Sequence, residues 1–238
     1  PTLSSLRADI PPHEGEGELS SRFNESPGEG RTMGKLLSNF RTTFLLSIVL
    51  AGVMILSFGR IAPGGFDTSF WQAVLRWVHV VAGILWIGLL YYFNFVQIRV
   101  MPSIPAELKP AVSKHIAPEA LFWFRWSALV TVLAGLGIML ARGHAYAAEV
   151  LSLGFAGGLV DGDQPFTLMG IGTWLAIIMF LNVWGIIWPN QKRALGIVAV
   201  DDDAKAKAAR VAMLGSRTNL LLSLPMLTSM AMYQTLFS

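Results

Sequence analysis

The segment from Gln72 to Ile98 constrains this chain most, because it has the pattern of a membrane-spanning helix and still carries ionisable side chains. It is long enough to cross the hydrocarbon of a bilayer, which is about 30 Å thick and takes roughly 20 apolar residues of helix. Arg76 and His79 nevertheless lie within it, one helical turn apart. Ionisable groups inside a bilayer are costly and often mark a functional site, so His79 is the first candidate site residue.

Composition places the whole chain among integral membrane proteins. Of its 238 residues, 53% are hydrophobic and only 14% are charged, and the mean hydropathy is +0.54. These values do not suit a soluble domain. Because the sequence contains no cysteine, it cannot supply thiolates to zinc or an iron–sulfur cluster, nor the thioether bonds of haem c. The net charge of +3 is modest, and we expect no nucleic-acid partner.

Five apolar stretches of helical length predict an all-α, polytopic membrane bundle, formed by residues 41–238. They lie at about 42–58, 72–98, 120–141, 167–188 and 212–237. None alternates with a period of two, so helices are favoured over a β-barrel. Residues 1–40 contain acidic and Gly/Pro-rich stretches with few apolar residues. We expect these residues to form an extended polar arm that contacts other membrane subunits.

The distribution of basic residues predicts the orientation. Lysine and arginine are concentrated in the N-terminal arm and in the loops after the second and fourth spans. Loops of this kind stay in the cytoplasm, so we expect an N-in, C-out bundle of five helices in contact with lipid. Two connecting segments are expected to be helical: residues 145–160 on the outer surface, and residues 201–211 leading directly into the fifth span.

A layer of polar residues is expected in the cytoplasmic half of the bundle, since a rise of about 1.5 Å per residue converts sequence position into depth. Its members are Asn94, Arg125, Asn182, Gln191, Arg217 and Asn219. One interpretation is a pocket for a planar, anionic, hydrogen-bonding molecule, with Trp123, Trp126 or Trp184 stacking on it. The other is structural: arginines at helix ends anchor to lipid phosphate and asparagines link helices. Position favours the structural interpretation, because snorkelling at a helix end costs little.

His79 also has two interpretations. It is either the single axial ligand of a haem b or a chlorophyll-type pigment, or a neutral side chain that is hydrogen-bonded between helices. The other histidines lie outside the spans, so a six-coordinate haem would take a methionine such as Met54, Met139 or Met230. A chlorophyll-type pigment takes only one protein ligand. The spans contain essentially no Asp or Glu, which disfavours proton pumping through buried acids.

Three motifs occur in order along the chain: RWVHVVAGILWIG at 76–88, NVWGIIWPNQ at 182–191 and SRTNLLLSLPML at 216–227. Together they resemble the membrane domain of the bacterial urate hydroxylase family, in which that domain is joined to a cytochrome c and is associated with oxidation of urate. The resemblance implies a shortened form that lacks the cytochrome c domain. The residues that it highlights are Arg76, His79, Asn182, Trp184, Pro189, Gln191, Ser216, Arg217, Asn219 and Pro225.

The residues and the resemblance leave alternative functions open. The first is an auxiliary subunit of a larger photosynthetic or respiratory electron-transfer complex in a bacterial cytoplasmic membrane, which would not be an enzyme by itself. The second is a urate- or purine-oxidising module that uses the polar layer and passes electrons to a separate cytochrome c. A small transporter ranks below both, because inverted repeats and broken helices are not evident in the sequence.

Overall fold

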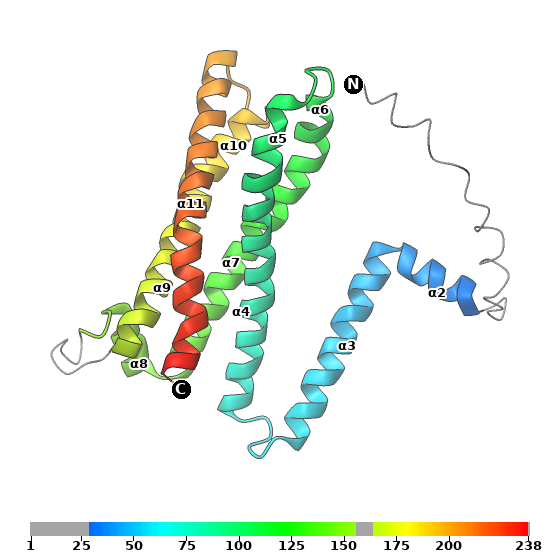
Figure 1. The fold of residues 1–238 in the computed structure, drawn as a ribbon. Coiled ribbons are helices and arrows are strands. Elements are labelled where there is room, and N and C mark those ends of the chain that lie inside the picture. The colour runs from blue at the N-terminus through cyan, green and yellow to red at the C-terminus, as the bar shows by residue number, and fades with distance from the viewer. Residues whose placement is uncertain (1–28, 156–163, 238) are drawn as a thin grey trace, which may run out of the picture. The chain divides into compact units, whose positions relative to one another are not determined.

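The computed structural model describes residues 29–155 and 164–237, and these residues form helices and connections without a strand. The chain divides into two units, Pro1–Ala62 and Pro63–Ser238. The first unit contains α2 (Glu29–Ser38) and α3 (Phe40–Ile61). The second contains all the other helices (Figure 1).

Residues 29–38 form the helix α2, so the prediction that residues 1–40 form an extended arm is wrong for this part. Met33, Leu36 and Leu37 recur there at helical spacing, a signal that the acidic and Gly/Pro-rich composition of the preceding residues obscures. Asn39 then caps α3: its Oδ1 accepts from the backbone N–H groups of Arg41 at 3.1 Å and Thr42 at 3.3 Å. The expected contact of the arm with other subunits falls mostly on residues 1–28, which lie outside the described residues.

The second unit is built on four long helical segments that run alternately up and down (Figure 1). They are α4 (Thr68–Tyr91) with η1 (Tyr92–Gln97) and α5 (Ile98–Val100), α7 (Ala117–Ala141), α9 (Gln164–Asn182) with η5 (Val183–Ile187) and α10 (Trp188–Ala194), and α11 (Asp202–Leu236). Shorter elements are η2 (Met101–Ser103), α6 (Lys109–Ala111), η3 (Val112–Ile116) and α8 (His144–Leu151).

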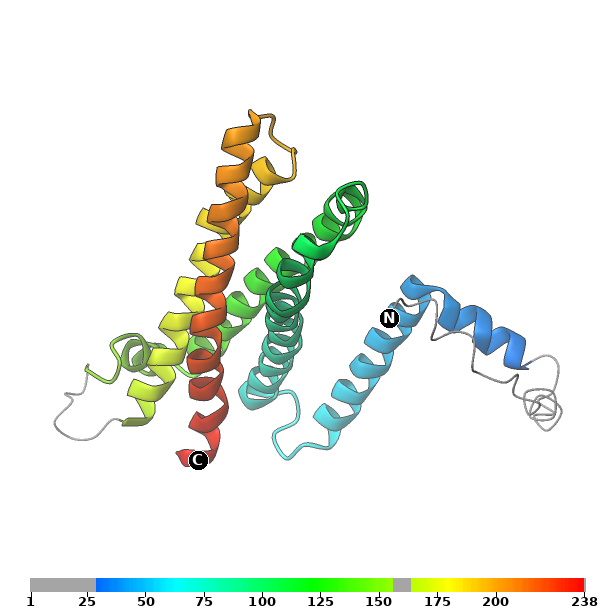
Figure 2. The same ribbon diagram turned by 45° about the horizontal axis from the view of Figure 1, so that its top comes forward.

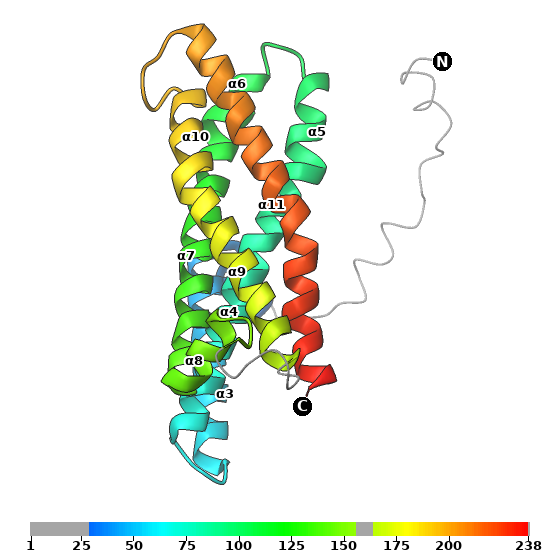
Figure 3. The ribbon, with the colours of Figure 1, turned by 90° about the vertical axis from the view of Figure 1, so that its left-hand side faces the viewer.

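Two pairs of helices make up this bundle. In the turned views of Figure 2 and Figure 3, as in Figure 1, α4 lies along α7 and α9 lies along α11. We call the end of the bundle that holds α8 and the C-terminal end of α11 the α8 end. The opposite end, where α10 leads into the start of α11, is the α10 end.

Within residues 29–155 and 164–237, four segments are long and apolar enough to cross a membrane: Phe40–Ile61, Thr68–Ser103, Lys109–Ala141 and Pro165–Ala194. They contain the first four predicted spans, and a membrane protein is therefore indicated. Each helix extends beyond its apolar stretch, because local capping contributes to setting the helix ends. At the start of α4, for example, Asp67 Oδ1 accepts from the N–H of Phe70 at 2.9 Å.

The long helix α11 contains both the predicted helix at 201–211 and the predicted fifth span. It begins at Asp202 and continues without a break to Leu236, and the preceding Asp201 caps it: its Oδ1 accepts from the N–H of Ala204 at 2.7 Å. It is less apolar than the four spans because it carries Arg217, Asn219 and several serines and threonines. The predicted helix at 145–160 is confirmed over α8 but is wrong for residues 152–155, which form turns, and residues 156–160 lie outside the described residues.

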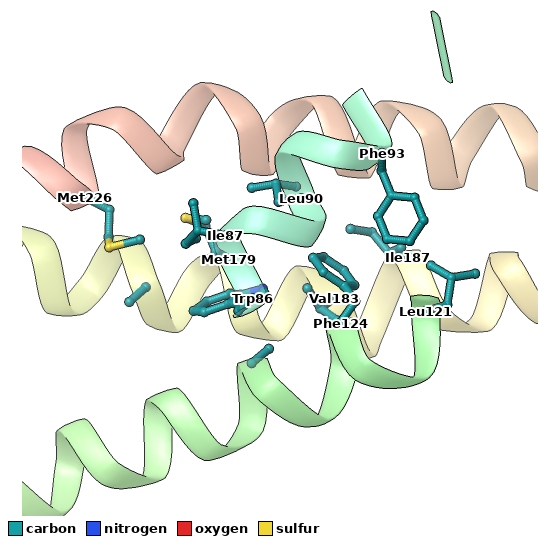
Figure 4. Close-up of a cluster of buried hydrophobic side chains, with 12 residues drawn as sticks. Trp86, Ile87, Leu90, Phe93, Leu121, Phe124, Met179, Val183, Ile187 and Met226 are labelled. Atoms are coloured by element: carbon teal, nitrogen blue, oxygen red, sulfur yellow. The ribbon is translucent and has the colours of Figure 1, made fainter. Parts of the chain in front are cut away.

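The core of the bundle is a cluster of buried apolar side chains halfway along it. Figure 4 shows Trp86 and Leu90 from α4, Phe124 from α7 and Met179 from α9 pointing toward one another. The rings of Phe93 and Phe124 meet edge to face with their centroids 5.7 Å apart. In lipid such contacts stabilise the bundle through close packing, since the surrounding hydrocarbon is as apolar as the core.

Three π-helical segments, η1, η3 and η5, lie toward the α10 end. Two of them end two residues before a proline: Ile116 precedes Pro118, and Ile187 precedes Pro189. Proline has no N–H and its ring clashes with the carbonyl four residues earlier, so a wider turn relieves that clash. These segments were not predicted from the sequence, although Pro118 and Pro189 could have indicated two of them.

Candidate functional site

The predicted polar layer lies at the α10 end and holds helices together by hydrogen bonds. Asn94, in η1, is only 3% exposed. Its Nδ2 donates to the carbonyl of Leu90 at 2.9 Å and to Ser216 Oγ of α11 at 2.8 Å. This bond between η1 and α11 is the structural role that asparagine often takes inside a membrane.

A second link joins α9 to α11. Asn182 Nδ2 donates to the carbonyl of Gly215 at 2.9 Å and to Asn219 Oδ1 at 2.7 Å. Asn219 is completely buried, and its Nδ2 donates to the carbonyl of Met179 at 3.0 Å. The two predicted site residues Asn182 and Asn219 are therefore brought together, and they stabilise the α9–α11 contact.

Arg125 stands apart from these links. It is 8% exposed, and its guanidinium carbon lies 3.4 Å from the centroid of the Trp188 ring, as in a cation–π contact. Among the described residues, its Nη1 has no hydrogen-bond partner, and the same holds for Gln97 Oε1, Trp184 Nε1 and Gln191 Oε1. The polar layer therefore contains buried donors and acceptors that its own side chains leave unpaired.

Other residues expected in this layer lie elsewhere. Arg217 is exposed on α11, although Asn219, two positions further on, faces the interior. The indole of Trp123 donates to Glu119 Oε1 at 3.0 Å on the outside of α7. Trp126 and Trp184 meet edge to face with their centroids 5.7 Å apart. Depth places a residue in a layer, but the direction in which its side chain points decides whether it joins that layer's interior.

The α8 end contains a cavity of about 340 Å³, which falls within the roughly 300–1,000 Å³ of small-molecule sites. Its walls come from α4, α7, α8, α9 and α11, and we call it the α8-end cavity. Its lining residues include Arg76, His79, Met139, Arg142, Met230 and Tyr233. Arg76 and Arg142 are exposed, so the cavity opens to its surroundings.

His79 is held in one orientation on the wall of this cavity. Its Nδ1 lies 2.7 Å from the carbonyl oxygen of Thr131 in α7. A carbonyl only accepts, so Nδ1 carries the proton and Nε2 keeps its lone pair. The ring lies over Gly135, where an added Cβ would be 3.0 Å from His79 Cε1. The expected hydrogen bond between helices is therefore present, and Nε2 has no partner in the described part of the chain.

Two tyrosines and an arginine form a hydrogen-bonded group beside His79. Arg142 Nη1 donates to Tyr146 Oη at 2.8 Å, and the hydroxyls of Tyr146 and Tyr233 are 3.4 Å apart. Burial, followed by the hydrogen bond with Tyr233, raises the pKa of Tyr146 to about 12. Tyr146 is therefore neutral near pH 7. This group was not predicted from the sequence. The apolar character of residues 145–160 indicated a helix there but no hydrogen-bonded group.

Comparison of the chain with models of known protein families, with curated proteins and with solved structures found no match. The resemblance to the urate hydroxylase membrane domain therefore stays a prediction that depends on three motifs.

Proposed function

We propose that this chain is a non-catalytic membrane subunit of a larger photosynthetic or respiratory electron-transfer complex, and that it holds one tetrapyrrole in the α8-end cavity. The main observation that supports the proposal is the geometry of His79. Its proton is fixed on Nδ1 by the Thr131 carbonyl, so Nε2 can bind a metal. A hydrogen bond of this kind sets the tautomer and orientation of metal-binding histidines in general.

The cavity also offers two thioethers that would help to hold a haem iron if one were bound. Met139 of α7 and Met230 of α11 line it together with His79, whereas Met54 belongs to the other unit of the chain. A thioether that bound a haem iron together with an imidazole would raise its reduction potential. When bound, the tetrapyrrole supplies one-electron redox chemistry or light absorption. The chain itself orients His79, excludes water with apolar walls and sets the polarity around the group.

Membership of a larger complex is tested by purifying the native protein from its own membrane in mild detergent. The subunit should migrate in native electrophoresis in an assembly well above the 26.0 kDa of the chain and its detergent belt. Partner chains should be identified in that band by mass spectrometry. A chain that migrates alone in several mild detergents would contradict membership of a complex.

We also propose that α11 is the fifth membrane span. Its polar residues Asn219, Ser223 and Ser229 are buried against the bundle, whereas Leu221 and Leu224 are exposed. These three polar side chains therefore point away from lipid. Most of the basic residues of this unit lie at the α10 end, among them Arg99, Lys114, Arg193 and Lys205. This distribution supports a cytoplasmic α10 end and an N-in, C-out orientation.

A second candidate function is a urate- or purine-oxidising module that binds its substrate in the polar layer. It is favoured by the buried Nη1 of Arg125, which lacks a partner among the described residues, and by the unpaired amide oxygens of Gln97 and Gln191. A planar anion could pair with the arginine and stack on a tryptophan.

Urate binding to the purified protein tests this candidate. Wild-type protein should bind urate, and Arg125→Ala should weaken binding by at least about tenfold, since a hydrogen bond to a charged group contributes roughly 1.5–3 kcal/mol. Arg217→Ala is the matched control, because that arginine is exposed. If wild-type protein does not bind urate, or if both variants bind it as wild type does, this candidate is wrong.

A further inference from the structure

A second feature of the cavity indicates which class of tetrapyrrole it binds. This inference rests on the function proposed above. We infer that Arg76 and Arg142 bind free carboxylates of the ligand, which is therefore a haem with ionised propionates and not a pigment whose acid side chain is esterified.

Arg76 lies one turn before His79 on α4 and lines the same cavity. Its side chain is exposed, and no acidic side chain pairs with it among the described residues. An arginine near the end of a membrane helix can reach the interface while its carbon chain follows the apolar wall. Arg76 can therefore meet an anionic group of a molecule whose body is held at His79.

Arg142 reaches the cavity from the end of α7. Its Nη1 donates to Tyr146 Oη at 2.8 Å, and its guanidinium carbon lies 4.9 Å from the centroid of that ring. These contacts orient the guanidinium without neutralising it. Glu149, on the same short helix as Tyr146, does not line the cavity. In the described part of the chain, the two arginines therefore bring two positive charges to the cavity with no counter-charge.

The rest of the wall suits the apolar body of such a ligand. Leu136, Met139, Met169 and Met230 line the cavity together with His79. The site thus combines an apolar interior, one nitrogen ligand and two guanidinium groups at exposed positions. Guanidinium binds carboxylate through paired hydrogen bonds, whereas an ester has no charge to attract it. A molecule with an apolar planar body and a carboxylate edge matches this arrangement.

The test is a titration of the full chain, purified in detergent without tetrapyrrole, with ferric haem b and with its dimethyl ester. The two molecules share the ring and the iron and differ only at the propionates, which are ionised in the diacid and uncharged methyl esters in the other. Binding is followed by the Soret band. Wild-type protein should bind the diacid roughly 10- to 100-fold more tightly, the range expected for a charge-assisted contact. Arg76→Gln and Arg142→Gln should each reduce this preference, and the double variant should abolish it.

Four further variants complete the test. Arg76→Lys and Arg142→Lys should keep much of the preference because they keep the charge, and Arg99→Gln, an exposed arginine at the α10 end, should keep all of it. If wild type binds both molecules equally while His79→Ala loses both, the carboxylate inference is wrong and the tetrapyrrole site stands. If neither molecule binds, or if His79→Ala binds both as wild type does, the proposed tetrapyrrole site itself is wrong.

Discussion

Replacing Gly172 with alanine should destabilise the bundle by about 1–3 kcal/mol, the usual cost of adding a methyl group to a tightly packed interface. Gly172 lies on α9 where that helix meets α11. A Cβ added there would be 2.5 Å from Ser229 Oγ and 2.9 Å from Ser229 Cβ. Ser229 cannot turn away without loss, because its hydroxyl donates to the carbonyl of Leu168 on α9. The helices would have to separate, which weakens the whole α9–α11 contact.

The matched control is Gly88→Ala on α4. Gly88 is exposed, and a Cβ added there meets nothing within 4 Å. Alanine is the better helix former by roughly 1 kcal/mol, so this variant should be neutral or more stable. Unfolding of both variants in mixed detergent, followed by circular dichroism, gives the comparison. Equal stability of the two variants would contradict the close α9–α11 contact.

The sequence predicted the helical elements well because hydropathy and capping act locally. The apolar stretches at 42–58, 72–98, 120–141 and 167–188 lie within the four candidate spans. The acidic and basic pattern of 201–211 correctly predicted a helix leading into 212–237, and α11 contains both. The number of spans and their orientation stay predictions.

The arrangement of the candidate site was harder to predict because it depends on the direction in which each side chain points. Depth alone grouped Arg217 with Asn219, but the first is exposed and the second is buried. Depth also placed Asn94, Asn182 and Asn219 together in the polar layer. In the structure, Asn94, Asn182 and Asn219 link helices there, while the cavity lies beside His79. The cavity could not be found from the sequence, since Arg142, Tyr146 and Tyr233 meet only through tertiary packing.

Replacing His79 with alanine should remove the nitrogen ligand from the α8-end cavity and abolish or strongly shift the Soret contribution of the tetrapyrrole proposed to bind there. The alanine leaves Thr131 without its hydrogen-bond donor, but that carbonyl lies in the middle of α7, so the bundle should still fold. Trp77→Phe is the control, because Trp77 is the exposed neighbour of Arg76 on α4 and does not line the cavity. Added imidazole should restore part of the lost band by occupying the space of the missing side chain.

The most direct test of the account is therefore the absorption spectrum of the protein purified from its own membrane in mild detergent, recorded for wild type, His79→Ala and Trp77→Phe. The account predicts that wild type and Trp77→Phe share a Soret contribution that is lost or strongly shifted in His79→Ala, as seen in the difference spectrum between His79→Ala and wild type. A featureless wild-type spectrum, or a band that His79→Ala leaves unchanged, would contradict it.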